Sequence, residues 1–210
     1  TLEPVRKAYY SKIKEKIMKK VKFMIVLICL LLGITSTAYS LPIAGVDIPD
    51  SLSAGNQQLA LNGAGIRKKF MMSMYVGALY LKAESRNAEK IIQSNEPMAI
   101  RLHIVSGMIT AKKMVNATKA GFETATNGNT TLIKEKIEKF ISIFKPGIEK
   151  GDIYDMIYLP GKGVKIYKNK SYLSTIKGLD FKKALFGIWL CKNPSHESPQ
   201  LKSGMLGIEK

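Results

Sequence analysis

The sequence predicts an α+β protein in which an antiparallel β-sheet is covered by a layer of helices, within a single domain. The predicted elements come in the order strands, two helices, strands and a final helix, whereas a parallel sheet needs regular alternation of strands and helices. The 210 residues are enough for one domain with additional segments. A content of 46% hydrophobic and 23% charged residues is typical of a folded globular protein.

The first 40 residues are expected to lie outside that domain. Residues 18–40 begin with MKKVKF, continue with an apolar run of 11 residues and end with Ala38-Tyr39-Ser40, a pattern typical of a secretory signal peptide. Residues 1–17 precede the first methionine, and we interpret them as translated from upstream of the true start. The domain is therefore expected at 41–210, in the periplasm or outside a bacterial cell. Membrane contact is expected only if the signal stays uncleaved.

The net charge of +17 does not by itself predict a nucleic-acid partner. The first 40 residues carry +6 of that charge, and in the remaining chain acidic residues stand among the lysines. No helix-turn-helix, zinc-finger or RNA-binding signature accompanies them. A basic, solvated surface explains the excess.

The motifs that would hold a cofactor or a metal ion are incomplete. Gly63 and Gly65 begin a dinucleotide-binding pattern, but Lys68 stands where the third glycine belongs and the sequence continues as a strand. The two histidines and Cys191 lie too far apart in sequence for a structural zinc site. We therefore predict no cofactor and no metal.

The first elements of the domain are predicted to be strands followed by a short helix. After a polar lead at 43–58 comes an apolar stretch at 59–83, LALNGAGIRKKFMMSMYVGALYLKA, in which glycines permit bends and close backbone approach. Residues 87–93 are predicted to form a short helix capped by Asn87.

The stretch 98–105 alternates as a strand, with Arg101 and His103 on the face opposite the isoleucines. If that face is solvated, both are ordinary surface residues. Otherwise they form a polar spot in a cavity. The sequence leaves the two possibilities open.

The second half of the domain is predicted to contain two helices, a three-stranded unit and a last helix. Apolar residues at spacings of three and four predict helices over 110–124 and 132–145, and Pro146 ends the second. The next residues, at 152–159, 164–169 and 171–176, are predicted to be strands, the first two joined by a PGKG turn. A final amphipathic helix is predicted over 178–192.

These stretches resemble the chalcone isomerase-like family, particularly its exported bacterial members. The resemblance begins in LNGAGIRKKFMMSMYVGALYLKA and continues through MAIRLHIVSGMITAKKM, the helix ending in FKPG, the hairpin around LPGKGVKIY, and FKKALFGIWLCKNP. It covers roughly residues 46–207. It implies an antiparallel sheet covered by helices, with a ligand cleft between them.

The resemblance also implies site residues. Arg67 occupies the place of the arginine that holds an anionic phenolate in the plant isomerases. Tyr75 occupies a cleft position that is threonine in those enzymes and tyrosine in the plant fatty-acid-binding members. A catalytic tyrosine and asparagine of the isomerases fall on Thr110 and Ala117, although Asn116 is adjacent. The ligand-binding candidates are thus Arg67, Tyr75, Thr110 and Asn116, and no catalytic residue is assigned.

The spacing of Arg67 and Tyr75 leaves their relation in space open. They are eight residues apart, four fewer than in the plant proteins. A turn between them would bring them together across a hairpin, whereas one straight strand would hold them ~26 Å apart. No strong turn residue lies in KKFMMSM, at 68–74.

Three functions are compatible with the sequence. The first is a non-catalytic exported protein that binds a fatty acid or similar amphipathic anion through Arg67, with a hydrogen bond from Tyr75. The second is an intramolecular-lyase-type isomerase that holds a phenolic substrate and stabilises an enolate. The third is an envelope structural or interaction module with solvated cations at a strand end. Whether the protein is an enzyme stays open, and loss of ligand in Arg67→Ala would exclude the third function.

Overall fold

The computed structural model describes residues 14–22, 40–192 and 199–208. The chain divides into two compact units, residues 1–38 and 39–210. In the first unit a short helix covers 14–22. The predicted signal peptide lies outside the described residues from 23 to 39, and the predicted leading extension is described only from residue 14. None of the helices in the described parts is long and apolar enough to cross a membrane.

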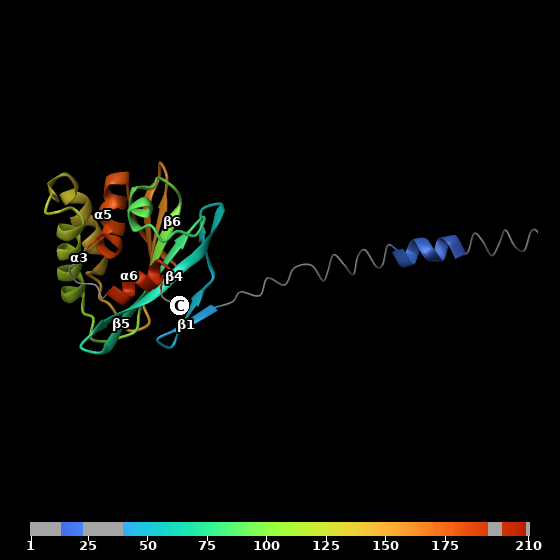
Figure 1. The fold of residues 1–210 in the computed structure, drawn as a ribbon, viewed down its shortest axis with the longest axis horizontal. Helices are drawn as coiled ribbons and strands as arrows, with labels where there is room; N and C mark the ends of the chain where they lie inside the picture. Colours follow the sequence, from blue (N-terminus) through green and yellow to red (C-terminus); the bar gives the residue numbers. More distant parts are fainter. Residues whose placement is uncertain (1–13, 23–39, 193–198, 209–210) are drawn as a thin grey trace, which may run out of the picture. The chain divides into compact units, whose positions relative to one another are not determined.

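The second unit is built on a seven-stranded antiparallel sheet in which each strand pairs with its neighbour in sequence. Figure 1 shows the long β4 and β5 beside β6 in this sheet. The strands are β3 (Ser51–Ala54), β4 (Gln57–Lys69), β5 (Met72–Leu81), β6 (Met98–Ile104), β7 (Ile153–Leu159), β8 (Gly163–Lys168) and β9 (Ser171–Ile176). A separate two-stranded sheet joins β1 (Ser40–Ile43) to β2 (Val46–Pro49).

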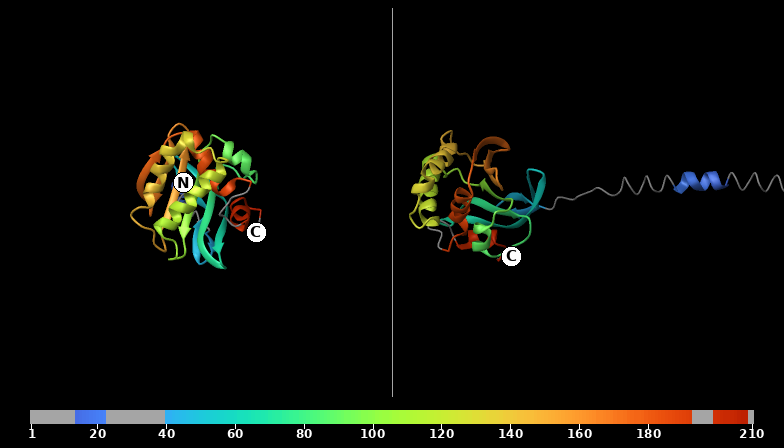
Figure 2. Two further views of the ribbon diagram at one scale, coloured as in Figure 1. Left: turned by 90° about the vertical axis from the view of Figure 1, so that its left-hand side faces the viewer. Right: turned by 90° about the horizontal axis from the view of Figure 1, so that it is seen from above.

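Helices cover one face of the large sheet, as the two views of Figure 2 show. The helices are α2 (Ala88–Gln93), α3 (Ala111–Ala125), α4 (Lys134–Ile141), α5 (Leu179–Leu190) and α6 (Pro199–Met205). Alternate residues of β5 and β6 pack against them, among them Leu79, Ile100 and Leu102. The other face carries a second apolar cluster, in which Ile48 of β2 packs with residues of the sheet such as Leu52 of β3. Both cores draw on residues from 40 onward, so residues 40–210 contain what they need to fold.

The predicted fold class is confirmed, and most predicted elements are present. The helix capped by Asn87 is α2, and the Asn87 side chain accepts a hydrogen bond from the Lys90 backbone N–H. The helix predicted over 132–145 is shorter, because 3-10 turns at 131–133 and 142–144 flank α4. The Ser142 hydroxyl bonds back to the Lys139 carbonyl at 2.8 Å, an arrangement that competes with regular helix.

Two parts of the sheet and helix arrangement were not predicted. The stretch interpreted as a polar lead contains β2 and β3, whose four-residue lengths give too little apolar alternation to detect. The short α6 was also missed. It lies so close to β4 that a Cβ atom on Gly65 would stand 2.6 Å from the Leu201 carbonyl oxygen. The glycines of β4 therefore serve helix packing and not a dinucleotide.

Candidate functional site

A cavity of about 580 Å³ lies between the helices and the β4–β5–β6 part of the sheet. This volume lies within the range of small-molecule sites, about 300 to 1,000 Å³. Most of its wall is apolar. The apolar side chains include Met74, Leu102, Ile109, Met114, Phe140, Phe144 and Ile188. The exposed part of the lining, which marks the mouth, comprises Lys69, Phe70, Met72, Met108, Lys113 and Asn116.

The β4–β5 hairpin brings Arg67 and Tyr75 together, so the straight-strand alternative is wrong. The two residues are directly paired in the ladder, and both line the cavity. The chain reverses at Phe70 and Met71, whose φ angles of 49° and 65° are those of a tight hairpin turn. Glycine or asparagine usually fills such positions, which is why KKFMMSM carries no turn signal.

An irregularity in the ladder completes this arrangement. Arg67 pairs with Tyr75 but Lys68 pairs with Ser73, so Met74 is an extra residue on β5. A bulge of this kind locally twists the strand and redirects its side chains. Directly opposed residues have Cβ atoms about 4.5 to 5.5 Å apart, which replaces the ~26 Å of a straight strand.

Tyr75 is held at the cavity wall by a residue that the sequence did not single out. The indole Nε1–H of Trp189 donates a hydrogen bond to the Tyr75 hydroxyl at 3.0 Å, and both side chains are buried. Trp189 lines the cavity and is the single tryptophan of the chain. It lies in α5, within the stretch 178–192 for which an amphipathic helix is predicted. Its polar N–H was the available signal that it needed a partner.

The site residues predicted on and before α3 have two different positions: some line the cavity, and one caps the helix. Asn116 and Ala117 of α3 both line the cavity, so either register of the resemblance places a residue there. Thr110 does not line it. Instead, the Thr110 hydroxyl is the N-cap of α3 and accepts a hydrogen bond from the Lys113 N–H at 3.3 Å. The structure thus brings Arg67, Tyr75 and Asn116 to one cavity and leaves Thr110 at its edge.

The charged residues of the described lining are all cationic. Arg67, Lys69 and Lys113 contribute to the lining, and no aspartate or glutamate does among the described residues. The Lys113 ammonium donates to the Met108 carbonyl at 3.1 Å, which holds this charge beside the mouth. Lys69 and Lys113 were not among the predicted site residues. The arrangement favours an anionic group at the mouth with its apolar part inside.

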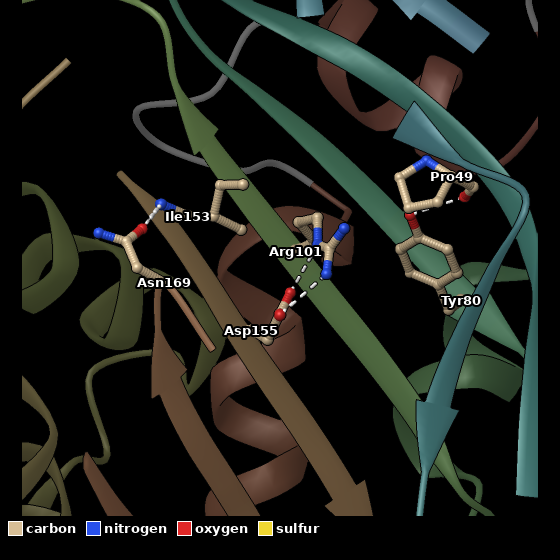
Figure 3. Close-up of polar contacts among 6 residues, drawn as sticks. All are labelled: Pro49, Tyr80, Arg101, Ile153, Asp155 and Asn169. Atoms are coloured by element: carbon tan, nitrogen blue, oxygen red, sulfur yellow. Dashed lines mark hydrogen bonds and ion pairs between the residues drawn. The ribbon is translucent and has the colours of Figure 1, made fainter. Parts of the chain in front are cut away.

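The opposite face of the sheet holds Arg101 in a different environment (Figure 3). Its guanidinium makes two hydrogen bonds to the Asp155 carboxylate, at 2.7 and 2.9 Å. Beside it, burial raises the pKa of Tyr80 to about 12, and the Tyr80 hydroxyl donates to the Pro49 carbonyl. Burial and the Arg101 charge together lower the pKa of His103. Arg101 is therefore part of a largely buried ion pair, and it does not line the cavity.

Lys182 is another cation that the sequence did not single out. It is fully buried, and its ammonium donates to the carbonyl oxygens of Ile91, Ile92 and Ser94 at 2.7 to 2.9 Å. Burial lowers its pKa to about 7. These contacts satisfy carbonyls at the C-terminal end of α2. Lys182 does not line the cavity, so its contacts assign it to joining α2 and α5.

Within the parts of the chain that the structure describes, no group of three or more His, Cys, Asp or Glu residues is placed to hold a metal ion.

Comparisons with known proteins agree with this architecture. Residues 40–207 match the family described as chalcone isomerase-like. Among solved structures, the fold is similar to that of a fatty-acid binding protein from Arabidopsis thaliana. The TM-score is 0.64 at 17% sequence identity, over 80% of this chain and 95% of the plant chain. No curated protein matches the sequence.

Proposed function

Because this chain belongs to the chalcone isomerase-like family, we propose that it is a non-catalytic binding protein whose cavity takes a fatty acid or a similar amphipathic anion. The observation that carries the proposal is the cavity itself, with apolar walls, cations at the mouth and no carboxylate in its described lining. The fold similarity to a plant fatty-acid binding protein supports the same class of ligand.

The walls determine how affinity depends on the ligand's length. Each buried methylene contributes about 0.8 kcal/mol, which corresponds to about fourfold in affinity. Affinity for straight-chain fatty acids should therefore rise about fourfold per methylene until the cavity is full, and then level off. If the cavity instead takes a phenolic ligand of fixed size, affinity should not increase in this regular way with the length of a fatty acid.

The mouth determines which end of the ligand carries the charge. Arg67 and Tyr75 are paired in the ladder and both line the cavity, so in this proposal the carboxylate of the ligand lies between the guanidinium and the phenol hydroxyl. A hydrogen bond to a charged group contributes about 1.5 to 3 kcal/mol. Lys69 and Lys113 add positive potential at the same mouth. The methyl end then lies among the phenylalanine and methionine side chains.

An isomerase that acts on a phenolic substrate is the second candidate, because Asn116 and Arg67 line the same cavity. The position corresponding to the catalytic tyrosine, Thr110, instead caps a helix and supplies no phenol. Conversion of a chalcone to a flavanone, followed by absorbance, tests this candidate. The envelope-module alternative predicts a cavity that stays empty. For location, the signal-like residues 18–40 support a periplasmic or secreted bacterial protein.

The deciding experiment is native followed by denaturing mass spectrometry on residues 40–210, purified without detergent. We expect a co-purifying fatty acid or related anion. Trp189 then reports titration of the emptied protein with fatty acids of increasing length, since it lies in the cavity wall.

Ala117→Phe is the matched variant for this experiment, because it fills cavity space from α3 without removing a charge. It should abolish binding while circular dichroism stays unchanged. The binding proposal would be contradicted if no small molecule co-purified and Trp189 fluorescence did not change on addition of fatty acids or chalcones. Equal binding by Ala117→Phe would place the ligand elsewhere.

A further inference from the structure

The tip of the β4–β5 hairpin exposes two large apolar side chains. Phe70 and Met71 are 83% and 95% exposed, and Met71 is the most exposed large apolar residue in the described parts of the chain. Figure 1 shows the hairpin projecting at the lower left, and the left view of Figure 2 shows it projecting below the helices. A projecting apolar tip is open to contact with a partner.

Folding does not explain why these two residues stand at the tip. Both have positive φ, which side chains with a Cβ adopt unfavourably and which a two-residue hairpin turn requires. Asn-Gly would form the same turn more easily. Nor do Phe70 and Met71 gain burial in return, since both are exposed. A function at the surface accounts for side chains that the turn itself disfavours.

Lysines lie beside the tip. Lys68 and Lys69 precede it and are exposed, and the Lys69 ammonium stands 5.7 Å from the centre of the Phe70 ring. Lys112 and Lys113 are exposed in the first turn of α3, and Lys113 lines the same cavity mouth as Phe70.

No acidic residue offsets these charges within the segments that form the mouth. Residues 57–83 and 97–122 contain no aspartate or glutamate. An apolar tip with lysines beside it is the pattern of a membrane interface, where apolar side chains enter the acyl region and lysines meet lipid phosphates.

We propose that this tip, with the lysines beside it, docks onto an anionic lipid bilayer. Phe70 and Met71 insert, and Lys68, Lys69 and Lys113 contact the phosphates. Two inserted side chains with a few charges give weak, reversible attachment. The projecting shape favours a bilayer over a protein partner, because a bilayer accepts a convex apolar tip without needing a matching groove.

Docking in this way brings the cavity mouth to the membrane. Phe70 and Met108 belong both to the exposed surface and to the lining of the mouth. An amphipathic ligand would then pass between bilayer and cavity with its acyl chain shielded from water. This route rests on the proposed function, whereas docking itself does not depend on any ligand.

The test is sedimentation of residues 40–210 with vesicles, because removing residues 1–39 also removes the apolar run at 24–34. Vesicles of equal phosphatidylglycerol and phosphatidylcholine are compared with pure phosphatidylcholine, at low and high salt. We expect binding to the anionic vesicles that weakens steeply with salt. Phe70→Asn with Met71→Gly should abolish binding while the melting temperature is unchanged or higher, because Asn-Gly suits the turn.

Charge and position are tested separately. Lys68→Gln with Lys69→Gln should weaken binding about thirtyfold, since each surface cation contributes about fivefold. Lys162→Gln with Lys177→Gln is the matched control, because both lysines are exposed beside the β7–β8 turn, at the opposite end of the sheet. Leu132→Ser is the apolar control, since Leu132 is 85% exposed but lies outside the mouth. Both controls should bind as the unchanged protein does.

The outcomes separate this proposal from the proposed function. Failure of the unchanged protein to bind anionic vesicles overturns docking and leaves the tip as a contact for an acidic protein. Equal binding by the Asn-Gly variant also overturns it. Titration of Trp189 with a soluble short-chain fatty acid, without vesicles, tests ligand binding alone. If the protein bound vesicles but Trp189 fluorescence did not respond to the fatty acid, the docking proposal would stand and the proposed ligand would be refuted.

Discussion

Two arginines on opposite faces of one sheet have different surroundings and different consequences. Arg67 of β4 lies on the helix-covered face and lines a cavity among apolar side chains. Arg101 of β6 lies on the other face, where Asp155 of β7 neutralises it through two hydrogen bonds. The comparison teaches that the surroundings of an arginine, and not the residue type, decide whether its charge faces a cavity or is neutralised inside the sheet.

The two faces also differ in how they are filled. On the Arg101 face, Ile48 of β2 and apolar residues of the sheet itself, such as Leu52 and Ala54 of β3, form a second packed cluster. On the Arg67 face, the helices leave about 580 Å³ unfilled. Substitutions on the packed face are therefore expected to lower the stability of the fold. Substitutions in the lining of the cavity are expected to lower ligand affinity instead.

The largest expected effect comes from breaking the ion pair. Asp155→Ala leaves a largely buried guanidinium without its carboxylate and should lower the free energy of unfolding by about 3 kcal/mol. Urea denaturation measures this, with the exposed Asp47→Ala as control. Ligand affinity of the remaining folded protein should not change. Combining Arg101→Met with Asp155→Leu should recover most of the loss, and a loss below ~1 kcal/mol for Asp155→Ala would refute a structural role.

Arg67→Ala is expected to show the reverse pattern. Losing a charge-assisted hydrogen bond of about 1.5 to 3 kcal/mol weakens fatty-acid binding roughly tenfold to a hundredfold. The free energy of unfolding should change by less than about 0.5 kcal/mol, because Arg67 is only half-buried and stands at a cavity wall, not in a packed core. Trp189 fluorescence and urea denaturation measure the two quantities. Arg86→Ala removes an exposed arginine outside the cavity and should change neither. If Arg67→Ala bound fatty acids with unchanged affinity, the anion site would have to be assigned to Lys69 and Lys113 instead of Arg67.

Tyr75→Phe tests how much the hydrogen bond between Trp189 and Tyr75 in the cavity wall contributes to stability. The change removes the acceptor for the Trp189 Nε1–H and leaves that buried donor without this bond. We expect the free energy of unfolding to fall by about 1 kcal/mol, together with a shift in tryptophan emission. Tyr172→Phe alters an exposed tyrosine and serves as control. Unchanged stability and emission would show that the Tyr75–Trp189 bond is not formed in solution.

The smallest expected effect is the pH dependence of stability that His103, on the same face as Arg101, contributes. Burial and Arg101 lower the pKa of His103 below the value of 6.5 that it has when exposed. Between the lowered pKa and 6.5 the unfolded chain binds more protons, so stability is full above 6.5 and falls as the pH falls through this window. His103→Gln should remove that part of the pH dependence. Identical profiles for both proteins, from denaturation at several pH values, would contradict the assignment.

Much of the fold was predictable because it rests on local patterns. Alternation over 98–105 predicted β6, and Asn87 marked the start of α2. The predicted separation of Ile100, Leu102 and Ile104 from Arg101 and His103 holds in the sheet. The strands β2 and β3 and the helix α6 were missed, because their pairing and packing depend on distant parts of the chain.

The candidate site was predictable only in part. Resemblance to a family supplied Arg67, Tyr75 and Asn116, which line one cavity, and Thr110, which does not. Trp189 and the two lysines of the mouth were not predicted, because nothing in a periodic pattern says which neighbours a side chain will meet. The membrane docking that we infer also goes beyond the sequence-based expectation, which confined membrane contact to an uncleaved signal.

By itself, the sequence determined the fold class, most of the helices and strands, and the cationic character of the stretch at 67–69, because hydrophobic spacing and charge are properties of neighbouring residues. The tertiary structure decided that Arg67 meets Tyr75 and that Arg101 is neutralised by Asp155. It also decided that the lysines stand around a mouth. Such outcomes depend on strand register and on a turn without a sequence signal, and one residue of slip would move each side chain to the other face.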